Sequence, residues 1–214
     1  MIIAELQGKI SSELAEKEDV LTSNVFSFFK YCDREFLKDY LNQIGKEKKI
    51  EVLLEEAKDA KFFFWKEYDD GTEPDLIVIC GKYYLLFEAK LYSPFSKETT
   101  NKKSQIEREI KMGDEAAEKE KKEFVYVAIT DGYYMDKEKY SEYGKRVKFI
   151  WTDWQSVTRF LESPERSFHS YGEYAKDLHD LLYKKNLRGY AGLRSIVNAC
   201  EQIDMPERIF YHGY

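Results

Sequence analysis

The chain has 214 residues, which is enough for one domain with a substantial core. Its formal charge of −6 excludes a protein that coats nucleic acid by bulk attraction, so any such contact must use local basic patches and a metal ion. There is no signal peptide and no apolar run of membrane length, and the three cysteines are far apart, so we expect a cytoplasmic protein with reduced thiols and no membrane partner.

The first 60 residues are predicted to be mainly helical. Apolar residues at helical spacing indicate an amphipathic helix over residues 2–18. Residues 22–24, Thr-Ser-Asn, supply N-cap chemistry for a second helix over about 25–44, which ends at Gly45. Residues 50–59 are expected to form a short helix or a connection.

A β-hairpin is predicted in the middle of the chain. Residues 62–68 are typical of a first strand, and two apolar runs follow at 76–80 and 83–87. The dipeptide Gly81-Lys82 separates the two runs, and glycine at the first central position is typical of a type II′ hairpin turn. The three strands are therefore expected to form an antiparallel meander.

The register of this hairpin places charged residues together. If Cys80 pairs with Tyr83, counting outward brings Asp75 directly opposite Glu88, and residues directly opposite share a face. Because side chains alternate along a strand, Lys90 lies on the same face as Glu88. That face continues inward with Ile77, Ile79, Tyr84 and Leu86, and the other face carries Leu76, Val78, Cys80, Leu85, Phe87 and Ala89.

Two carboxylates and a lysine at one end of a hairpin suggest phosphodiester chemistry. Asp75 and Glu88 could share a hard divalent cation such as Mg²⁺, and the carbonyl of Ala89 offers a further oxygen ligand. Such an ion polarises a phosphate and acidifies bound water. Lys90 would then hold the attacking water or stabilise the charge that develops on the phosphate.

These residues resemble a known family. Pro74-Asp75, followed after a hairpin by Glu88-Ala89-Lys90, is similar to the signature of the PD-(D/E)XK nuclease superfamily, which has the restriction-endonuclease-like fold. The resemblance covers about residues 13–151. It implies a nuclease that uses Mg²⁺, for which Mn²⁺ can substitute, and that has Asp75, Glu88 and Lys90 as catalytic residues.

The resemblance also implies accessory residues on two helices. In many members an acidic residue before the hairpin completes the metal site, and here Glu18 is the candidate, with Glu13 in reserve. A glutamine after the E-x-K strand recurs in several branches, which implies an accessory role for Gln105 in orienting the site or contacting the backbone of the nucleic acid. The sequence departs from the tightest version of that pattern, because Glu109 stands where a tyrosine is found.

The sequence after the hairpin predicts a helix that crosses over the sheet and leads into a parallel strand. The loop after Lys90 contains Lys97, Lys102 and Lys103, which could contact a phosphate backbone. Ser104 is predicted to cap a helix over about 105–123, and residues 124–130 form a continuous apolar run typical of a buried parallel strand. After a polar excursion at residues 133–144, a further strand is expected at 147–151, then a helix at 153–161 opened by the capping box Thr152-x-x-Gln155.

The C-terminal part changes in character from residue 163. A capping box at Ser170-x-x-Glu173 predicts a helix through Lys184. Basic and aromatic residues then alternate, so this arm could dock a partner or nucleic acid, or it could fold back on the domain. The histidines have no ligand spacing, which argues against a zinc site.

We therefore expect an α/β fold: a mixed central sheet flanked by helices in the αβββαβ order, with helical additions at both ends. A single domain would comprise a helical part (1–60), a sheet core (61–162) and a helical extension (163–214). Two functions remain open: a Mg²⁺-dependent endonuclease acting on nucleic acid, with DNA preferred, or an inactive nuclease-like module in a defence or repair complex. A homodimer would suit double-strand cutting.

Overall fold

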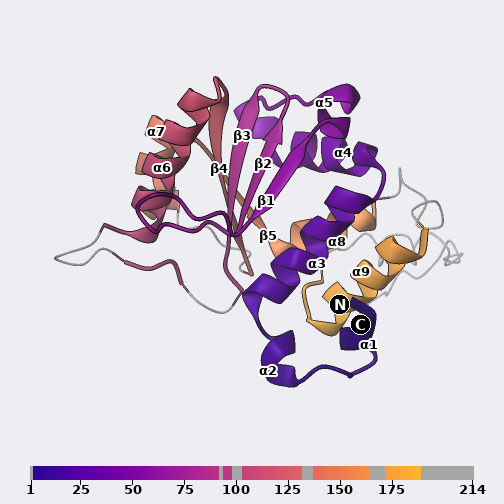
Figure 1. Cartoon of the computed structure of the whole chain (residues 1–214). Coiled ribbons are helices and arrows are strands. Elements are labelled where there is room, and N and C mark those ends of the chain that lie inside the picture. The colour runs from indigo at the N-terminus through magenta and orange to yellow at the C-terminus, as the bar shows by residue number, and fades with distance from the viewer. Residues whose placement is uncertain (1, 92–93, 98–102, 132–136, 164–171, 189–214) are drawn as a thin grey trace, which may run out of the picture.

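The computed structural model describes residues 2–91, 94–97, 103–131, 137–163 and 172–188. Its centre is a five-stranded mixed sheet in the order β1-β2-β3-β4-β5 (Figure 1). The strands are β1 (Lys61–Phe64), β2 (Leu76–Cys80), β3 (Tyr83–Ala89), β4 (Glu123–Thr130) and β5 (Lys148–Asp153). The first three strands are antiparallel, whereas β3, β4 and β5 run parallel to one another. The predicted α/β class with a mixed sheet is confirmed.

Helices cover both faces of the sheet (Figure 1). The first face packs against α3 (Glu18–Tyr31), α4 (Arg34–Ile44), α8 (Trp154–Leu161) and α9 (Gly172–Lys184), and the second against α6 (Gln105–Lys119) and α7 (Lys137–Arg146). The short helices α1 (Ile2–Leu6), α2 (Ser12–Ala15) and α5 (Leu54–Lys58), with a 3₁₀ turn at Lys46–Lys48, complete the described elements.

The predicted hairpin is confirmed residue by residue. Cys80 pairs with Tyr83 and Leu76 with Phe87, and Gly81 at the turn has φ +54°. A positive φ at the first central residue is what a type II′ turn requires, and glycine adopts it without steric cost. The two faces also separate as predicted: Leu76, Val78, Cys80, Leu85, Phe87 and Ala89 lie in one core, and Ile77, Ile79, Tyr84 and Leu86 lie in or against the other.

The crossover helix α6 lies very close to the sheet. Ser104 caps it as predicted, because its hydroxyl accepts a hydrogen bond from the amide of Glu107. A Cβ added at Gly113 would stand 2.4 Å from the ring of Phe124. Only a residue without a side chain therefore fits there, and this close approach fixes α6 over β4.

The N-terminal helices differ from the prediction. The single helix expected over residues 2–18 is broken into α1 and α2, because Gly8 has φ +64° and Ser11 caps a new helix by accepting from the amide of Leu14. The helix expected at 25–44 begins earlier, at Glu18, and is interrupted after Tyr31. Asp33 caps α4 through the amide of Glu35, and Gly45 ends it as expected.

The predicted first strand is too long. It ends at Phe64 rather than residue 68, because Trp65 has φ +49° and leaves the extended conformation. The helix predicted to reach residue 123 ends at Lys119, and Glu123 already belongs to β4.

Two expectations after β4 are also wrong. The excursion predicted at 133–144 contains helix α7, although residues 132–136 lie outside the described part. The predicted capping box at Thr152 is absent, because Thr152 belongs to β5 and its hydroxyl donates to Ser156, while Gln155 donates to the carbonyl of Asp131. Asp153 is the N-cap of α8, but its side chain makes no capping bond.

The described end of the C-terminal arm folds back on the N-terminus. The ammonium of Lys185 lies 2.5 Å from Oε1 of Glu5, and both groups are buried. Lys184 donates to the backbone carbonyls of Glu5 and Leu6. For these two lysines the fold-back alternative is correct, whereas Ser170 and residues 189–214 lie outside the described part. Within the described ranges, no helix is long and apolar enough to cross a membrane.

Candidate active site

The candidate active site lies where β2 begins and β3 ends. The register that pairs Leu76 with Phe87 sets Asp75 opposite Glu88. Oδ2 of Asp75 accepts a hydrogen bond of 2.7 Å from the amide of Ala89, and the carbonyl of Asp75 accepts one of 3.2 Å from the amide of Trp65. Both backbone contacts hold the aspartate at the end of the hairpin, next to the glutamate.

Lys90 joins this pair from the same strand end. Its ammonium donates to Oε1 of Glu88 at 2.6 Å and to Oε1 of Glu18 at 3.1 Å. The main chain of Lys90 is fixed on both sides, because its amide donates to Ile129 at 2.7 Å and its carbonyl accepts from the indole of Trp154 at 3.3 Å. The lysine is therefore directed at the carboxylates by the sheet itself.

Glu18 reaches the site from the first turn of α3. Its Oε2 accepts from the amide of Leu91 at 2.7 Å, while its Oε1 accepts from Lys90. An acidic residue is favourable at a helix N-terminus, where the helix dipole is positive. The structure thus brings Glu18 to the predicted site. Glu13, the reserve candidate, is exposed on α2.

Gln105 connects the site to the segment that precedes α6. Its side-chain Nε2 donates to Oε1 of Glu88, and its Oε1 accepts from the amide of Ser96 at 3.4 Å. Its own amide donates to the carbonyl of Ser96 at 3.1 Å. The predicted accessory position near the carboxylates is therefore occupied by Gln105.

A fourth carboxyl group, that of Glu109, was not predicted to belong to the site. It lies one helical turn after Gln105, is 1% exposed, and its Oε2 accepts a hydrogen bond of 2.6 Å from Tyr126 on β4. The signal was available in the sequence, because Gln105, Ile106, Glu109 and Ile110 share the i, i+4 spacing of one helix face. If Ile106 and Ile110 pack on the sheet, Glu109 does as well.

Burial and mutual repulsion make Asp75, Glu88 and Glu109 hard to ionise. Burial first, and then the charge of Glu88, raise the pKa of Asp75 to about 8. Burial and Glu109 raise the pKa of Glu88, and burial raises the pKa of Glu109. Burial alone would lower the pKa of Lys90, but the carboxylates of Glu88, Glu18 and Asp75 together raise it. Among the described residues, Lys90 thus supplies an ammonium that contacts Glu88 and Glu18, while Asp75 and Glu109 accept from Ala89 and Tyr126.

One carboxylate oxygen of the site is free to bind a divalent cation. Oε2 of Glu88 is buried and has no hydrogen-bond partner, although a buried carboxylate oxygen without a partner is costly. Within the described residues, no group of three or more acidic, histidine or cysteine side chains forms a metal cage. Mg²⁺ does not need one, since it often binds through one or two carboxylates plus water and substrate phosphate.

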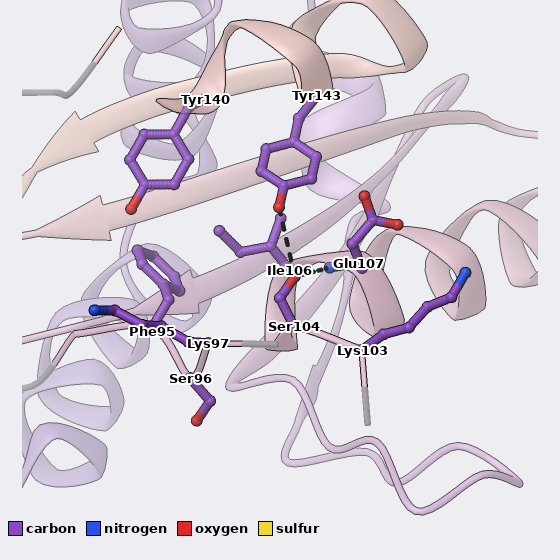
Figure 2. A pocket seen from close by; sticks show the side chains of 9 residues that line it. All are labelled: Phe95, Ser96, Lys97, Lys103, Ser104, Ile106, Glu107, Tyr140 and Tyr143. Carbon is purple, nitrogen blue, oxygen red and sulfur yellow. Dashed lines mark hydrogen bonds between the residues drawn. The ribbon is translucent and has the colours of Figure 1, made fainter. Parts of the chain in front are cut away.

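The predicted loop lysines border a pocket beside the site. Lys97 and Lys103 both line it, together with residues of α6 and α7 (Figure 2). Lys102 lies outside the described residues. Compared with known proteins, the chain has no significant match to a protein-family model, to a curated protein or to a solved structure.

Proposed function

We propose that this protein is a Mg²⁺-dependent nuclease that hydrolyses phosphodiester bonds, with DNA as its substrate and Mn²⁺ as an alternative ion. The observation that carries the proposal is the unpartnered, buried Oε2 of Glu88 beside Asp75 and Lys90. The order of one helical segment, three meandering strands, a crossover helix and a parallel strand supports membership of the PD-(D/E)XK superfamily.

Each residue then has a definite role. Asp75, Glu88 and the carbonyl of Ala89 would hold the ion, which when bound would supply a polarised phosphate and an acidified water. Lys90 donates hydrogen bonds to the attacking water or to the phosphate oxygen that gains charge. Glu18 lies beside Lys90 and would complete the set of oxygen ligands around the ion.

Gln105 has a positioning role in this proposal. Its amide nitrogen holds Oε1 of Glu88, which leaves Oε2 as the oxygen that faces a ligand. Its backbone amide and its side-chain oxygen both bond the backbone of Ser96, which keeps the preceding segment beside the site. A side chain that fixes the orientation of a reacting carboxylate lowers the cost of organising the site during the reaction.

The charge of the site also favours a bound cation. Four carboxyl groups with one ammonium leave an excess of acid in a place from which water is largely excluded. In the absence of an ion the groups share protons, as the raised pKa values of Asp75, Glu88 and Glu109 indicate. A divalent cation together with a substrate phosphate would balance this charge.

The test is cleavage of single- and double-stranded DNA by the pure protein. We expect cutting with Mg²⁺ or Mn²⁺ and none with EDTA. Asp75→Ala and Lys90→Ala should each lower the rate by about 100-fold or more. Lys111→Ala is the matched control, because Lys111 is an exposed lysine of α6. The proposal fails if both site variants cut as well as the wild type.

An inactive, nuclease-like binding module is the second candidate. The overall charge of −6 and the engagement of Lys90 with both Glu88 and Glu18 favour it, because an ammonium already provides part of the counter-charge. Calorimetric titration with Mg²⁺ separates the two. A module that hydrolyses nothing should show no ion binding that depends on Asp75 and Glu88.

A cytoplasmic location forms part of the proposal. Cys32 and Cys80 are free thiols in the structure, as expected of a protein kept in a reducing compartment. Cys200 lies outside the described residues.

A further inference from the structure

An aromatic pocket of about 450 Å³ lies beside the candidate active site (Figure 2). Phe95 and Tyr140 both line it and pack edge to face, with ring centroids 6.2 Å apart and planes at 69°, and the hydroxyls of Tyr143 and Ser104 are 3.4 Å apart. Tyr140 and Tyr143 both stack on Phe149 of β5. The rings are thus held by the core and present a preformed apolar surface.

The rim of this pocket is basic. Lys97 and Lys103 extend in opposite directions from it in Figure 2, and neither forms an ion pair with another residue of the described part. The carboxylate that lines the pocket, Glu107, is neutralised by Arg146 at 2.8 Å. The pocket therefore combines a planar apolar surface with two available ammonium groups.

The pocket shares a wall with the candidate active site. The ammonium of Lys90 lies 5.7 Å from the centre of the Phe95 ring, which lines the pocket. Ser96, another lining residue, is bonded to Gln105, whose side chain holds Glu88. A planar group in the pocket would therefore be separated from the candidate active site by the shared residues Phe95 and Ser96.

We infer that the pocket receives an unpaired nucleobase, so that the substrate is single-stranded DNA. The inference rests on the proposed nuclease function and names the form of nucleic acid that this site accepts. Aromatic side chains bind bases of any sequence by stacking, and lysines bind the adjoining phosphates. A base within a duplex is paired and stacked, and would have to be extruded before it could enter such a pocket.

Binding without a divalent ion tests this independently of cleavage. Fluorescence anisotropy in EDTA compares three labelled DNAs of equal length: a single strand, the same strand with abasic residues in place of bases, and a duplex. We expect the wild type to bind the normal strand about tenfold more tightly than the abasic strand or the duplex. Tyr140→Leu should remove most of this preference.

Charge variants keep the test valid if Tyr140→Leu does not fold. Lys103→Glu should weaken binding of both single strands several-fold, whereas Lys111→Glu, an equal charge change at an exposed position of α6, should not. Equal affinity for the normal and abasic strands, or for the duplex, would overturn the inference. So would full competition by a mononucleotide, which would indicate a small-molecule site. If the preference is present but Mg²⁺ gives no cutting, the nuclease proposal fails and the base pocket stands.

Discussion

The ammonium of Lys90 lies 2.6 Å from Oε1 of Glu88, two residues earlier on the same strand end. The side chains of Lys90 and Glu88 are 12% and 2% exposed, so this ion pair is largely removed from water. The same ammonium contacts Glu18 from a helix 72 residues earlier in the chain. Lys90 thus joins the sheet to α3, because its ammonium contacts a carboxylate from each.

Replacing Lys90 by methionine should abolish cutting without unfolding the protein. Methionine has a similar length, so the packing near Phe95 is retained, while the donor to the reacting groups is lost. We expect the cleavage rate to fall by about 100-fold or more, as when a single charge-stabilising donor is removed from an enzyme. Initial rates on labelled DNA at saturating Mg²⁺ measure the loss. Lys111→Met should cut normally, and an equally active Lys90→Met would exclude a role for this lysine.

Glu88→Gln should make the ion-free protein more stable while it removes activity. The raised pKa of Glu88 shows that its charge is unfavourable in the fold, because burial and Glu109 both oppose ionisation. A neutral amide retains an oxygen that accepts from Lys90. Urea unfolding at pH 8 in EDTA should therefore give a gain of about 1 kcal/mol. A loss of stability with unchanged Mg²⁺ affinity would show that Glu88 is only a structural partner of Lys90.

The stability of the ion-free protein should fall as the pH rises. The pKa of Asp75 is about 8 in the fold and 3.8 in its ordinary state, so between these values the folded protein keeps a proton that the unfolded chain releases. The free energy of unfolding then decreases with pH, by about 1.4 kcal/mol per pH unit for each proton so held.

Denaturation curves from pH 5 to pH 8 in EDTA measure this slope. Mg²⁺ should reduce it, because the ion binds the ionised carboxylates and displaces their protons. The double variant Asp75→Asn, Glu88→Gln serves as the control and should have a flatter profile. Identical slopes for the wild type and the double variant would contradict the assignment of the raised pKa values to this pair.

The core of the candidate site could be predicted because it is local. Gly81 sets a two-residue turn, and once the turn is known the register follows by counting, so Asp75 and Glu88 must meet. Lys90 follows from the alternation of side chains along β3. No information from distant parts of the chain is needed for these three residues.

The rest of the site depends on tertiary contacts that spacing does not encode. Glu18 reaches Lys90 only because α3 begins seven residues earlier than predicted, with Thr22 and Asn24 buried inside the helix instead of capping it. The break before α4 depends on Asp33, one charged residue among many in that segment. Trp65 ends β1 by a left-handed conformation, which a tryptophan rarely adopts and which a propensity argument does not foresee.

The packing of α6 on the sheet gives a prediction about stability. Gly113→Ala would place a methyl group against the Phe124 ring and the Leu86 side chain, at 2.4 and 3.0 Å before relaxation. Alanine favours the helix by about 1 kcal/mol, but overpacking a core costs about 1–3 kcal/mol, so we expect a net loss. Urea unfolding should show a lower midpoint with an unchanged slope. Increased stability would mean that α6 can move away from β4 at little cost.

Glu109→Gln should shift the pH dependence of cutting rather than abolish it. Glu109 is buried, bonded to Tyr126, and its charge is the second largest cause of the raised pKa of Glu88. Removing that charge lowers the pKa of Glu88, so the glutamate ionises at a lower pH and binds the metal ion there. The acidic limb of the pH–rate profile, measured at fixed Mg²⁺, should therefore move to lower pH, by about one unit if the change in interaction free energy is about 1.4 kcal/mol. Glu115→Gln is a suitable control, because Glu115 lies on the same helix but is exposed and pairs with Lys111 away from the site. An unshifted acidic limb, or complete loss of cutting at every pH, would show that Glu109 does not act on the site through the charge of Glu88.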